Sequence, residues 1–552
     1  MAGQALPFKA RAVSWQRGQY DLVCTMVEND SLEKKRQAVS GGGEELMITL
    51  INPPGLKLLS GLQMHTPNPP LGLAYIAGAI KDAGLPYTVI DGTGEALDAI
   101  SRYPGRADLM VQGLSFEEIA RRIPERTRVI GLSCMFSALW PLTRDLAARI
   151  RARFPDAILV LGGEHATAVP ELVLRTSPFD IVVLGEGEET LVRLVRAVSD
   201  GRHWQDLPGI ACLAGGAFRN NGLSARNRKI DDLAWPDWDS FPIEQYIARH
   251  QMNGSNLGRS MPLLSTRGCP YQCTFCSSPH MWTTRYIPRD PVQVVDEIEA
   301  YKTKYNVVNV DFQDLTAVVK RRWVVAFCRE LIGRKLDVTW QMPSGTRCEI
   351  FDEEVADLLY RSGCRALAFA PESGSPEILA KIKKQVSLDH MLAAMRVAVR
   401  RGFRLSCFMV IGLPDDSPAT LRQSLRLVRR MALLGVHDVA ITKFVPYPGS
   451  ELFKRLQREG RIALDDEFFL SPMDFYTRRS PSYSAHVSTN ALYVMMLWMF
   501  VNFYVISFAC RPFRTARILL KALVTGTEET RFAKWLNDVL FVRRRWRRLA
   551  RA

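Results

Sequence analysis

Short, unbroken apolar runs, each followed by a stretch of helical periodicity, recur in two series along the chain. The first series lies in residues 46–200, with runs such as AILVLGG (157–163), and the second lies in residues 259–475, with runs such as RALAFA (365–370). Continuous Val, Ile and Leu runs indicate strands buried on both faces, and alternation with helices indicates parallel sheets. The chain has 552 residues, which is too long for a single hydrophobic core. We therefore predict an α/β protein with two main units.

The two units are expected to differ in architecture. The first holds five runs and predicts a doubly wound, Rossmann-like sheet, in which ligands bind beyond the carboxyl ends of the strands. The second holds six βα units, which favour a partial (βα)6 TIM-type barrel over the full eight. The remaining segments are predicted as a loose N-terminal extension (1–45), a linker rich in Trp, Pro and Asp (201–258), and a helical, basic C-terminal region (476–552).

The charge distribution excludes one class of function. The formal net charge is +15, but from Arg511 onward 12 Lys and Arg stand against 3 Asp and Glu. More than half of the excess is therefore in the last segment, which indicates a basic tail and no nucleic-acid-binding body. The N-terminal residues lack the apolar segment of a secretory signal, so we expect a cytoplasmic, reducing location and free thiols.

Three cysteines follow the first strand of the second series (262–266). Cys269, Cys273 and Cys276 have the spacing C-x3-C-x2-C, which suits zinc or an iron–sulfur cluster. Zinc needs a fourth ligand, and His280 is available in the sequence. Structural zinc sites, however, usually occur in small modules that lack a core of their own, whereas this loop is on a predicted barrel. Three thiolates on a [4Fe–4S] cluster leave one iron open, which is useful only if something binds there.

This spacing, with Phe275 before the last cysteine and a barrel strand before the loop, resembles the radical S-adenosylmethionine (SAM) superfamily. The resemblance implies that SAM chelates the open iron and that an electron from the cluster cleaves it to methionine and a 5′-deoxyadenosyl radical. It also implies SAM contacts from loops that follow the barrel strands. The residues implied are Phe275, Asp314, Arg347, Glu372, Ser373 and Gly412.

The first unit has no G-x-G-x-x-G after its first strand, so a dinucleotide is not expected. It resembles instead the cobalamin-binding domain family, whose pattern is D-x-H-x-x-G, then S-x-L, then G-G. Thr93 stands at the axial histidine position, which implies that no imidazole from that position lies beneath cobalt; His65 and His165 remain conceivable ligands. The cobalamin contacts that the resemblance implies are Asp91, Thr93, Ser133, Gly162, Gly163, Gly185, Glu186 and Gly187.

Together the two resemblances imply a cobalamin-dependent radical SAM enzyme that methylates an unactivated carbon through methylcobalamin and a 5′-deoxyadenosyl radical. Two alternatives stay open: a cyclase or rearrangement enzyme of the same cofactor class, and a non-catalytic, cobalamin-sensing membrane protein. Because the radical must meet both substrate and cobalt, we expect one cavity between the two units, walled by Trp235 and Trp238 of the linker. A flavodoxin or ferredoxin is the implied electron donor.

The C-terminal region contains 19 consecutive, mostly apolar residues (491–509). Their length permits a membrane span, but a single span would export the basic tail, against the positive-inside rule. Peripheral attachment to the inner face of the membrane, or packing on the barrel, fits better. In the first case Arg511, Arg514, Arg517, Lys521 and Arg543–Arg545 would face anionic headgroups. A membrane-facing tail favours a lipid or another small-molecule natural product as substrate.

Overall fold

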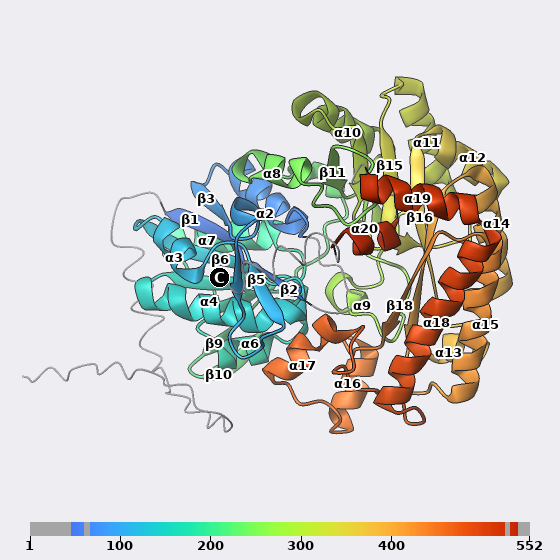
Figure 1. The fold of residues 1–552 in the computed structure, drawn as a ribbon. Coiled ribbons are helices and arrows are strands. Elements are labelled where there is room, and N and C mark those ends of the chain that lie inside the picture. The colour runs from blue at the N-terminus through green and yellow to red at the C-terminus, as the bar shows by residue number, and fades with distance from the viewer. Residues whose placement is uncertain (1–45, 60–66, 525–529, 539–552) are drawn as a thin grey trace, which may run out of the picture.

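The computed structural model describes residues 46–59, 67–524 and 530–538 (Figure 1). The predicted N-terminal extension, His65 and Arg543–Arg545 lie outside these residues. Two α/β units stand side by side, the N-terminal unit in blue and cyan and the barrel in green to orange (Figure 1). The C-terminal helices, in red, lie against the barrel.

The N-terminal unit is built on a seven-stranded sheet with the order β10-β9-β8-β7-β6-β1-β3. Its five predicted strands are all present and parallel, which confirms the doubly wound sheet. Helices α2 and α7 pack on one face, and α3 and α4 pack together on the other. The strands are β1 (Met47–Asn52), β3 (Tyr87–Asp91), β6 (Thr127–Ser133), β7 (Ile158–Gly162) and β8 (Ile181–Val183), and the helices are α2 (Leu71–Asp82), α3 (Phe116–Arg122), α4 (Trp140–Arg153), α5 (Glu164–Ala168), α6 (Pro170–Thr176) and α7 (Glu188–Ser199).

The predicted linker (201–258) contains regular structure. Strands β9 (Ile210–Ala214) and β10 (Ala217–Asn220) form an antiparallel hairpin that extends the N-terminal sheet. Gly215 and Gly216 connect them with φ angles of 62° and 76°, the left-handed conformation that a two-residue hairpin turn requires. A small antiparallel sheet was also missed, formed by β2 (Gly55–Leu58), β5 (Leu109–Gln112) and β4 (Ile100–Arg102). Helix α8 (Ile243–Ala248) follows the hairpin.

The second unit is the predicted six-stranded partial barrel, with the order β11-β14-β15-β16-β17-β18 and parallel pairing throughout. Strands β11 and β18 are its edges, so the barrel is open between them. Helices cover its outside. The strands are β11 (Ser260–Leu263), β14 (Asn309–Phe312), β15 (Thr339–Thr346), β16 (Cys364–Glu372), β17 (Arg404–Ile411) and β18 (Asp438–Lys443), and the helices are α10 (Pro291–Tyr305), α11 (Arg321–Arg334), α12 (Glu353–Arg361), α13 (Pro376–Lys381), α14 (Leu388–Arg401) and α15 (Pro418–Leu434).

The C-terminal region is helical, as predicted. It comprises α18 (Thr489–Cys510), α19 (Pro512–Val524) and α20 (Arg531–Asn537), whereas α16 (Glu451–Arg458) and α17 (Asp466–Leu470) precede it, within the bounds predicted for the barrel (259–475). Helix α18 is long and apolar enough to cross a membrane by length and composition. One face of it packs on α15 and β18, however, through Leu492, Met496, Met499, Phe503 and Ser507. Of the arrangements left open by the sequence, the structure therefore shows packing on the barrel for this face.

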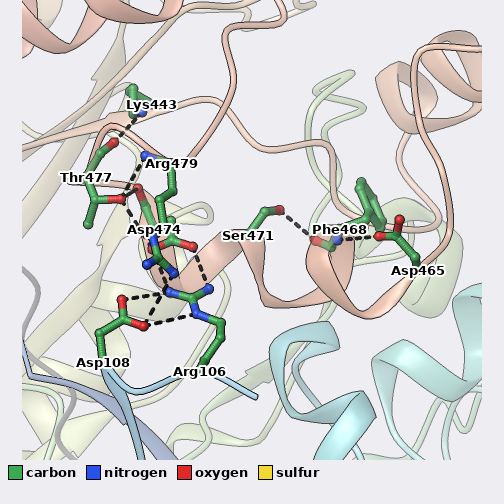
Figure 2. Close-up of polar contacts among 9 residues, drawn as sticks. All are labelled: Arg106, Asp108, Lys443, Asp465, Phe468, Ser471, Asp474, Thr477 and Arg479. Carbon is green, nitrogen blue, oxygen red and sulfur yellow. Dashed lines mark hydrogen bonds and ion pairs between the residues drawn. The ribbon is translucent and has the colours of Figure 1, made fainter. Parts of the chain in front are cut away.

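Residues 465–480, which we call the interdomain strap, join the two units (Figure 2). Arg106, in the β4–β5 loop of the N-terminal unit, pairs with Asp474 of the strap at 2.8 Å, and Arg144 pairs with Asp466 at 2.8 Å. On the barrel side, the buried Lys443 donates from Nζ to the carbonyl oxygens of Thr477 and Ser480, both at 2.6 Å. The strap therefore holds the N-terminal unit against the barrel.

Candidate active site between the two units

A cavity of about 1580 Å³ lies between the carboxyl ends of the N-terminal strands and the interior of the barrel. Small-molecule sites usually occupy about 300–1,000 Å³, so there is room for more than one ligand. The expected single cavity is confirmed, but its predicted walls are wrong. Trp238 is buried and donates to Tyr301 at 3.0 Å, and neither it nor Trp235 lines the cavity. The interdomain strap contributes a wall instead, through Pro472, Met473, Phe475 and Tyr476.

The residues implied for cobalamin converge on this cavity. They come from the carboxyl ends of β3, β6 and β7 and from the loops that follow β3, β7 and β8, and parallel strands bring these ends to one edge of the sheet. Asp91 is the exception. Its carboxylate accepts hydrogen bonds from Asn52 Nδ2, Gly94 N and Tyr246 Oη, so it shapes the turn beneath the cavity. The lining members, which we call the cobalamin cradle, are Thr93, Ser133, Gly162, Gly163, Gly185, Glu186 and Gly187.

Glycines leave the cradle open. A Cβ built on Gly162 meets no atom within 4 Å, so a larger side chain there would occupy cavity space. A Cβ on Gly163 would lie 2.5 Å from the carbonyl oxygen of Cys134, and its φ is 109°, so only glycine fits. A cavity floor made of backbone suits a broad, flat macrocycle, and the residues present therefore fit cobalamin.

Neither the axial position, occupied by Thr93, nor His165 supplies an imidazole to the cradle. Thr93 donates from Oγ1 to the carbonyl oxygen of Pro53 at 3.0 Å. His165 does not line the cavity: its Nδ1 is 2.9 Å from Ser137 Oγ, and its ring stacks on Trp140 with centroids 5.0 Å apart. Burial lowers the pKa of His165 to about 3, so it is neutral. His165 is a packed hydrogen-bonding residue rather than a ligand in the cavity.

Buried ion pairs connect the cradle to the cysteine loop. Glu186 accepts from Arg267 at 3.2 Å and from Arg226 at 3.0 Å, and Arg267 also pairs with Glu188 at 2.5 Å. Arg267 lies two residues before Cys269 and is 5% exposed. The charge of Glu186 at the cavity is therefore balanced by two arginines, and Arg267 links the cradle directly to the cysteine loop.

The cysteine loop is bounded by a short antiparallel pair of strands, β12 (Thr266–Arg267) before it and β13 (Ile287–Pro288) after it. Gly268 enters the loop with φ 82°, and a Cβ there would lie 2.2 Å from the carbonyl oxygen of Arg285. At the far side, Thr274 N donates to Ile382 O at 3.0 Å and Leu452 N donates to Thr274 O at 2.9 Å. Helix α9 (Ser278–Trp282) follows. The loop is thus held at both ends in front of the barrel.

The donor set fits an iron–sulfur cluster better than zinc. Cys269, Cys273 and Cys276 are free, half-buried thiols. Among the residues that the structure describes, no three His, Cys, Asp or Glu side chains converge as ligands of a single metal ion. His280 Nε2 instead lies 3.2 Å from Thr167 O. Burial raises the pKa of all three thiols, and the smaller opposing effect of Arg347 and Lys384 at Cys269 and Cys273 does not reverse that direction.

Most residues implied for SAM contacts lie outside the large cavity. Asp314 lines it, and accepts hydrogen bonds from Ser265 Oγ at 2.8 Å and from Thr266 Oγ1 at 2.5 Å. Glu372, with φ 63°, pairs with Lys384 at 2.9 Å beside the cysteine loop. Ser373 Oγ accepts from Ser375 N at 3.1 Å. For these three, SAM contact stays a prediction.

Three further predicted contacts are engaged with protein neighbours. The Arg347 guanidinium lies over the Tyr271 ring at 3.7 Å from its centroid. Phe275 packs against the apolar cluster around Ile378. At Gly412, a Cβ would lie 2.3 Å from Leu492 Cδ2 of α18, so this helix side chain covers the glycine. Their roles toward SAM also remain predictions.

Sequence reasoning missed the barrel-side polar wall of the cavity, which includes Ser255 and Gln341. Gln341 Nε2 donates to the carbonyl oxygen of Ser255 at 2.8 Å and to Asp311 Oδ1 at 2.6 Å. A usable signal was present, because Gln341 is a polar residue inside a predicted buried strand, and such residues point to a hydrogen-bonded network.

Asp311 gives this network a pH dependence. The carboxyl group is fully buried, which raises its pKa from 3.8 to about 6. The folded protein therefore holds this proton more tightly than the unfolded chain, so stability is lost as the pH rises from about 4 through 6. We expect Asp311→Asn to remove this contribution, worth about 3 kcal/mol at most. Urea unfolding of both proteins at about pH 4 and about pH 8 measures it, and an identical pH dependence would contradict the prediction.

Comparisons with known proteins support the assignment of both units. A family model described as the radical SAM superfamily matches residues 263–428, and one described as the B12 binding domain matches residues 62–195. An uncharacterized methyltransferase of Pyrococcus horikoshii is 27% identical over 412 residues, covering 74% of this chain and 83% of the relative. An anaerobic magnesium-protoporphyrin IX monomethyl ester cyclase of Rubrivivax gelatinosus is 28% identical over 394 residues, covering 70% and 66%.

Among solved structures, the radical S-adenosylmethionine methyltransferase TsrM of Kitasatospora setae, with tryptophan substrate and a SAM analogue bound, superposes with a TM-score of 0.59. The two are 19% identical, and the match covers 75% of this chain and 76% of TsrM. At this identity the likeness establishes the shared fold: a B12-binding domain followed by a radical SAM domain.

Proposed function

We propose that this chain is a cobalamin-dependent radical SAM enzyme of the methyltransferase family and that it methylates an unactivated carbon of a hydrophobic small molecule. The observation that carries the proposal is the shared cavity. The cobalamin cradle and the barrel interior open into one space, with the cysteine loop tied to its edge by Arg267. A methyl donor and a radical source that share a cavity can act on one substrate.

Each cofactor has residues suited to hold it. The three cysteines would ligate the [4Fe–4S] cluster, the cradle would hold cobalamin, and Asp314, Arg347, Glu372 and Ser373 are proposed around SAM. When bound, the cluster with SAM supplies a 5′-deoxyadenosyl radical, and cobalamin supplies the methyl group. The protein's own residues orient these groups, and the strap and α18 contribute walls of the cavity.

The substrate is proposed to be hydrophobic because the barrel side of the cavity is lined largely by apolar side chains. They come from several elements, so the apolar character belongs to the whole wall and not to one strand. Its members include Met342, Phe408, Val439, Leu497, Phe500 and Phe532. A lipid or an apolar natural product would bury its surface there, at roughly 25 cal/mol per Å² removed from water.

The cellular setting is proposed from the same chemistry. The cluster needs a low-potential electron, for which a flavodoxin or ferredoxin is the expected donor, and a cytoplasmic location keeps the thiols reduced. Peripheral contact with the inner face of the membrane is proposed as well. It does not use Arg511 and Arg514, because these side chains donate to carbonyl oxygens at the end of α15, including Leu433 O and Gly435 O.

Methyl transfer is tested with anaerobically reconstituted protein, SAM that carries a deuterated methyl group, and a lipid extract as the substrate source. We expect deuterated methyl in an organic-soluble product, together with 5′-deoxyadenosine, and neither product in a control with Cys276→Ala. Release of 5′-deoxyadenosine with no labelled methyl in any product would contradict methyl transfer.

That contrary outcome would favour a second function, ring formation or rearrangement. The similarity to the Rubrivivax cyclase supports it, since that protein matches over 70% of this chain. Here the product would carry no additional methyl group. The two functions therefore differ in a single mass-spectrometric readout of the same reaction.

A further inference from the structure

The barrel is open between its edge strands β11 and β18, and the C-terminal helices flank this gap. Helix α18 runs along β18. Helix α20 bridges one end of the gap, where Phe532 N donates to Asp438 Oδ1 at 3.3 Å and Lys534 Nζ donates to Met252 O at 3.1 Å. The large cavity extends to both helices, because residues of α18 and Phe532 and Trp535 of α20 line it.

The outer face of α18 carries an exposed apolar stripe. Val494, Trp498, Val501 and Val505 are 59%, 51%, 49% and 60% exposed, and their spacing of four, three and four residues places them on one side of the helix. Val501 and Val505 also line the cavity. The stripe and the cavity are therefore continuous, and the cavity has a lateral, apolar mouth beside α18.

The helices beside this stripe carry basic side chains, and one of these, Arg430 of α15, pairs with Asp389 of α14 at 3.9 Å. Helices α15, α18 and α19 contain no Asp or Glu, and α15 packs directly on α18. Arg429 links them by donating to Asn502 Oδ1 at 2.9 Å. Helix α19 continues the apolar surface with exposed Phe513 and Leu520. The exposed arginines of this face are Arg422, Arg426, Arg429 and Arg430 on α15 and Arg517 on α19.

An exposed apolar stripe flanked by arginines matches the chemistry of an anionic bilayer surface: the apolar side chains enter the headgroup boundary and the guanidinium groups meet phosphates. Tryptophan is favoured at this depth because its ring is both apolar and a hydrogen-bond donor. Contiguous exposed apolar surface of this kind marks an interaction site rather than ordinary surface.

We propose that the face formed by α15, α18 and α19, here called the docking face, binds an anionic phospholipid bilayer and presents the lateral mouth to it. A membrane-dissolved substrate then passes between α18 and the edge of the barrel into the cavity without crossing water. This substrate route rests on the proposed function, whereas binding of the docking face to lipid does not.

The test is co-sedimentation of the reconstituted full chain with vesicles of phosphatidylcholine alone or of phosphatidylcholine with phosphatidylglycerol. We expect binding to the anionic vesicles, weakened by salt because the headgroup contacts are screened. The double variant Arg426→Glu with Arg430→Glu should bind at least about tenfold more weakly, since roughly 1 kcal/mol is attributed to each basic residue near the surface. Arg322→Glu, an exposed arginine on α11, is the matched control and should bind as the parent does.

Insertion of the stripe into the bilayer is measured by the fluorescence of Trp498. The fluorescence difference between the parent and Trp498→Phe isolates this side chain, and vesicles of brominated phospholipid should quench it. A parent that does not bind anionic vesicles, or equal binding by the α15 double variant, would overturn the docking face. A dimer in light scattering that Val494→Glu dissociates, without vesicle binding by the parent, would assign the face to a second copy instead.

The two proposals fail separately. Vesicle binding needs neither SAM nor the cluster, so it is scored without turnover. If vesicles bind but no lipid is methylated, the docking face stands and the proposed substrate falls. If a soluble substrate is methylated and vesicles do not bind, the proposed chemistry stands and the docking face falls.

Discussion

Replacing Cys276 by alanine is expected to lower 5′-deoxyadenosine formation by more than about 10³-fold, which corresponds to more than about 4 kcal/mol of lost activation. The physical reason is the loss of one of three thiolate ligands, without which the cluster that binds and reduces SAM is not held in place. Cobalamin binding should persist, because Cys276 does not line the cobalamin cradle. Iron, cobalt and 5′-deoxyadenosine are quantified on the same anaerobic preparation.

Cys212→Ala is the matched control. Cys212 is a fully buried, free cysteine in β9, remote in sequence from the cysteine loop. Its replacement should leave iron content and 5′-deoxyadenosine unchanged. Retention of full iron and SAM cleavage in Cys276→Ala would remove the cluster assignment, and stoichiometric zinc in the parent would do the same.

Gly162→Leu is expected to weaken cobalamin binding by about 100-fold or more, because the side chain fills the cradle where no protein atom stands within 4 Å. The substitution is compatible with the fold, since Gly162 lies at the end of β7 outside the left-handed region. Iron content and SAM cleavage should survive, while methyl transfer is lost. This single substitution would therefore separate cobalamin binding from SAM cleavage.

Gly333→Leu provides the comparison. A Cβ there also meets no atom within 4 Å, but Gly333 is on the outer helix α11 and does not line the cavity. Cobalt stoichiometry and the dissociation constant for hydroxocobalamin are measured for both variants. Unchanged cobalamin affinity in Gly162→Leu would show that the macrocycle is bound elsewhere.

The main architecture was predictable because its signals are local. Buried parallel strands appear in the sequence as unbroken apolar runs, and all eleven predicted runs correspond to parallel strands of the two units. The β9–β10 hairpin was missed because its strands are short and β10 is largely exposed, which left Gly215-Gly216 as the clearest signal. The cradle was also predictable, since each member follows a strand at the same edge of the sheet.

Contacts made across long sequence distances were not predictable. Leu492 covers Gly412 from a helix eighty residues away, and the Arg106–Asp474 pair joins residues 368 positions apart. The prediction of a basic tail was likewise incomplete. Two of its arginines are engaged by the end of α15, and four of the five exposed arginines of the docking face belong to α15 itself. Composition locates charge along the chain, whereas packing decides which charges reach the surface.

The position of the interdomain strap in the chain has a consequence for how the holoenzyme is assembled. The strap contributes a wall of the cavity, yet it follows both units in the sequence, so it leaves the ribosome after them. Domains fold as units during synthesis, N-terminal first. Until Arg106 and Lys443 receive their strap partners, the cradle stays open on that side. A macrocycle could therefore enter the cradle before the strap is in place and be enclosed when the strap packs against both units.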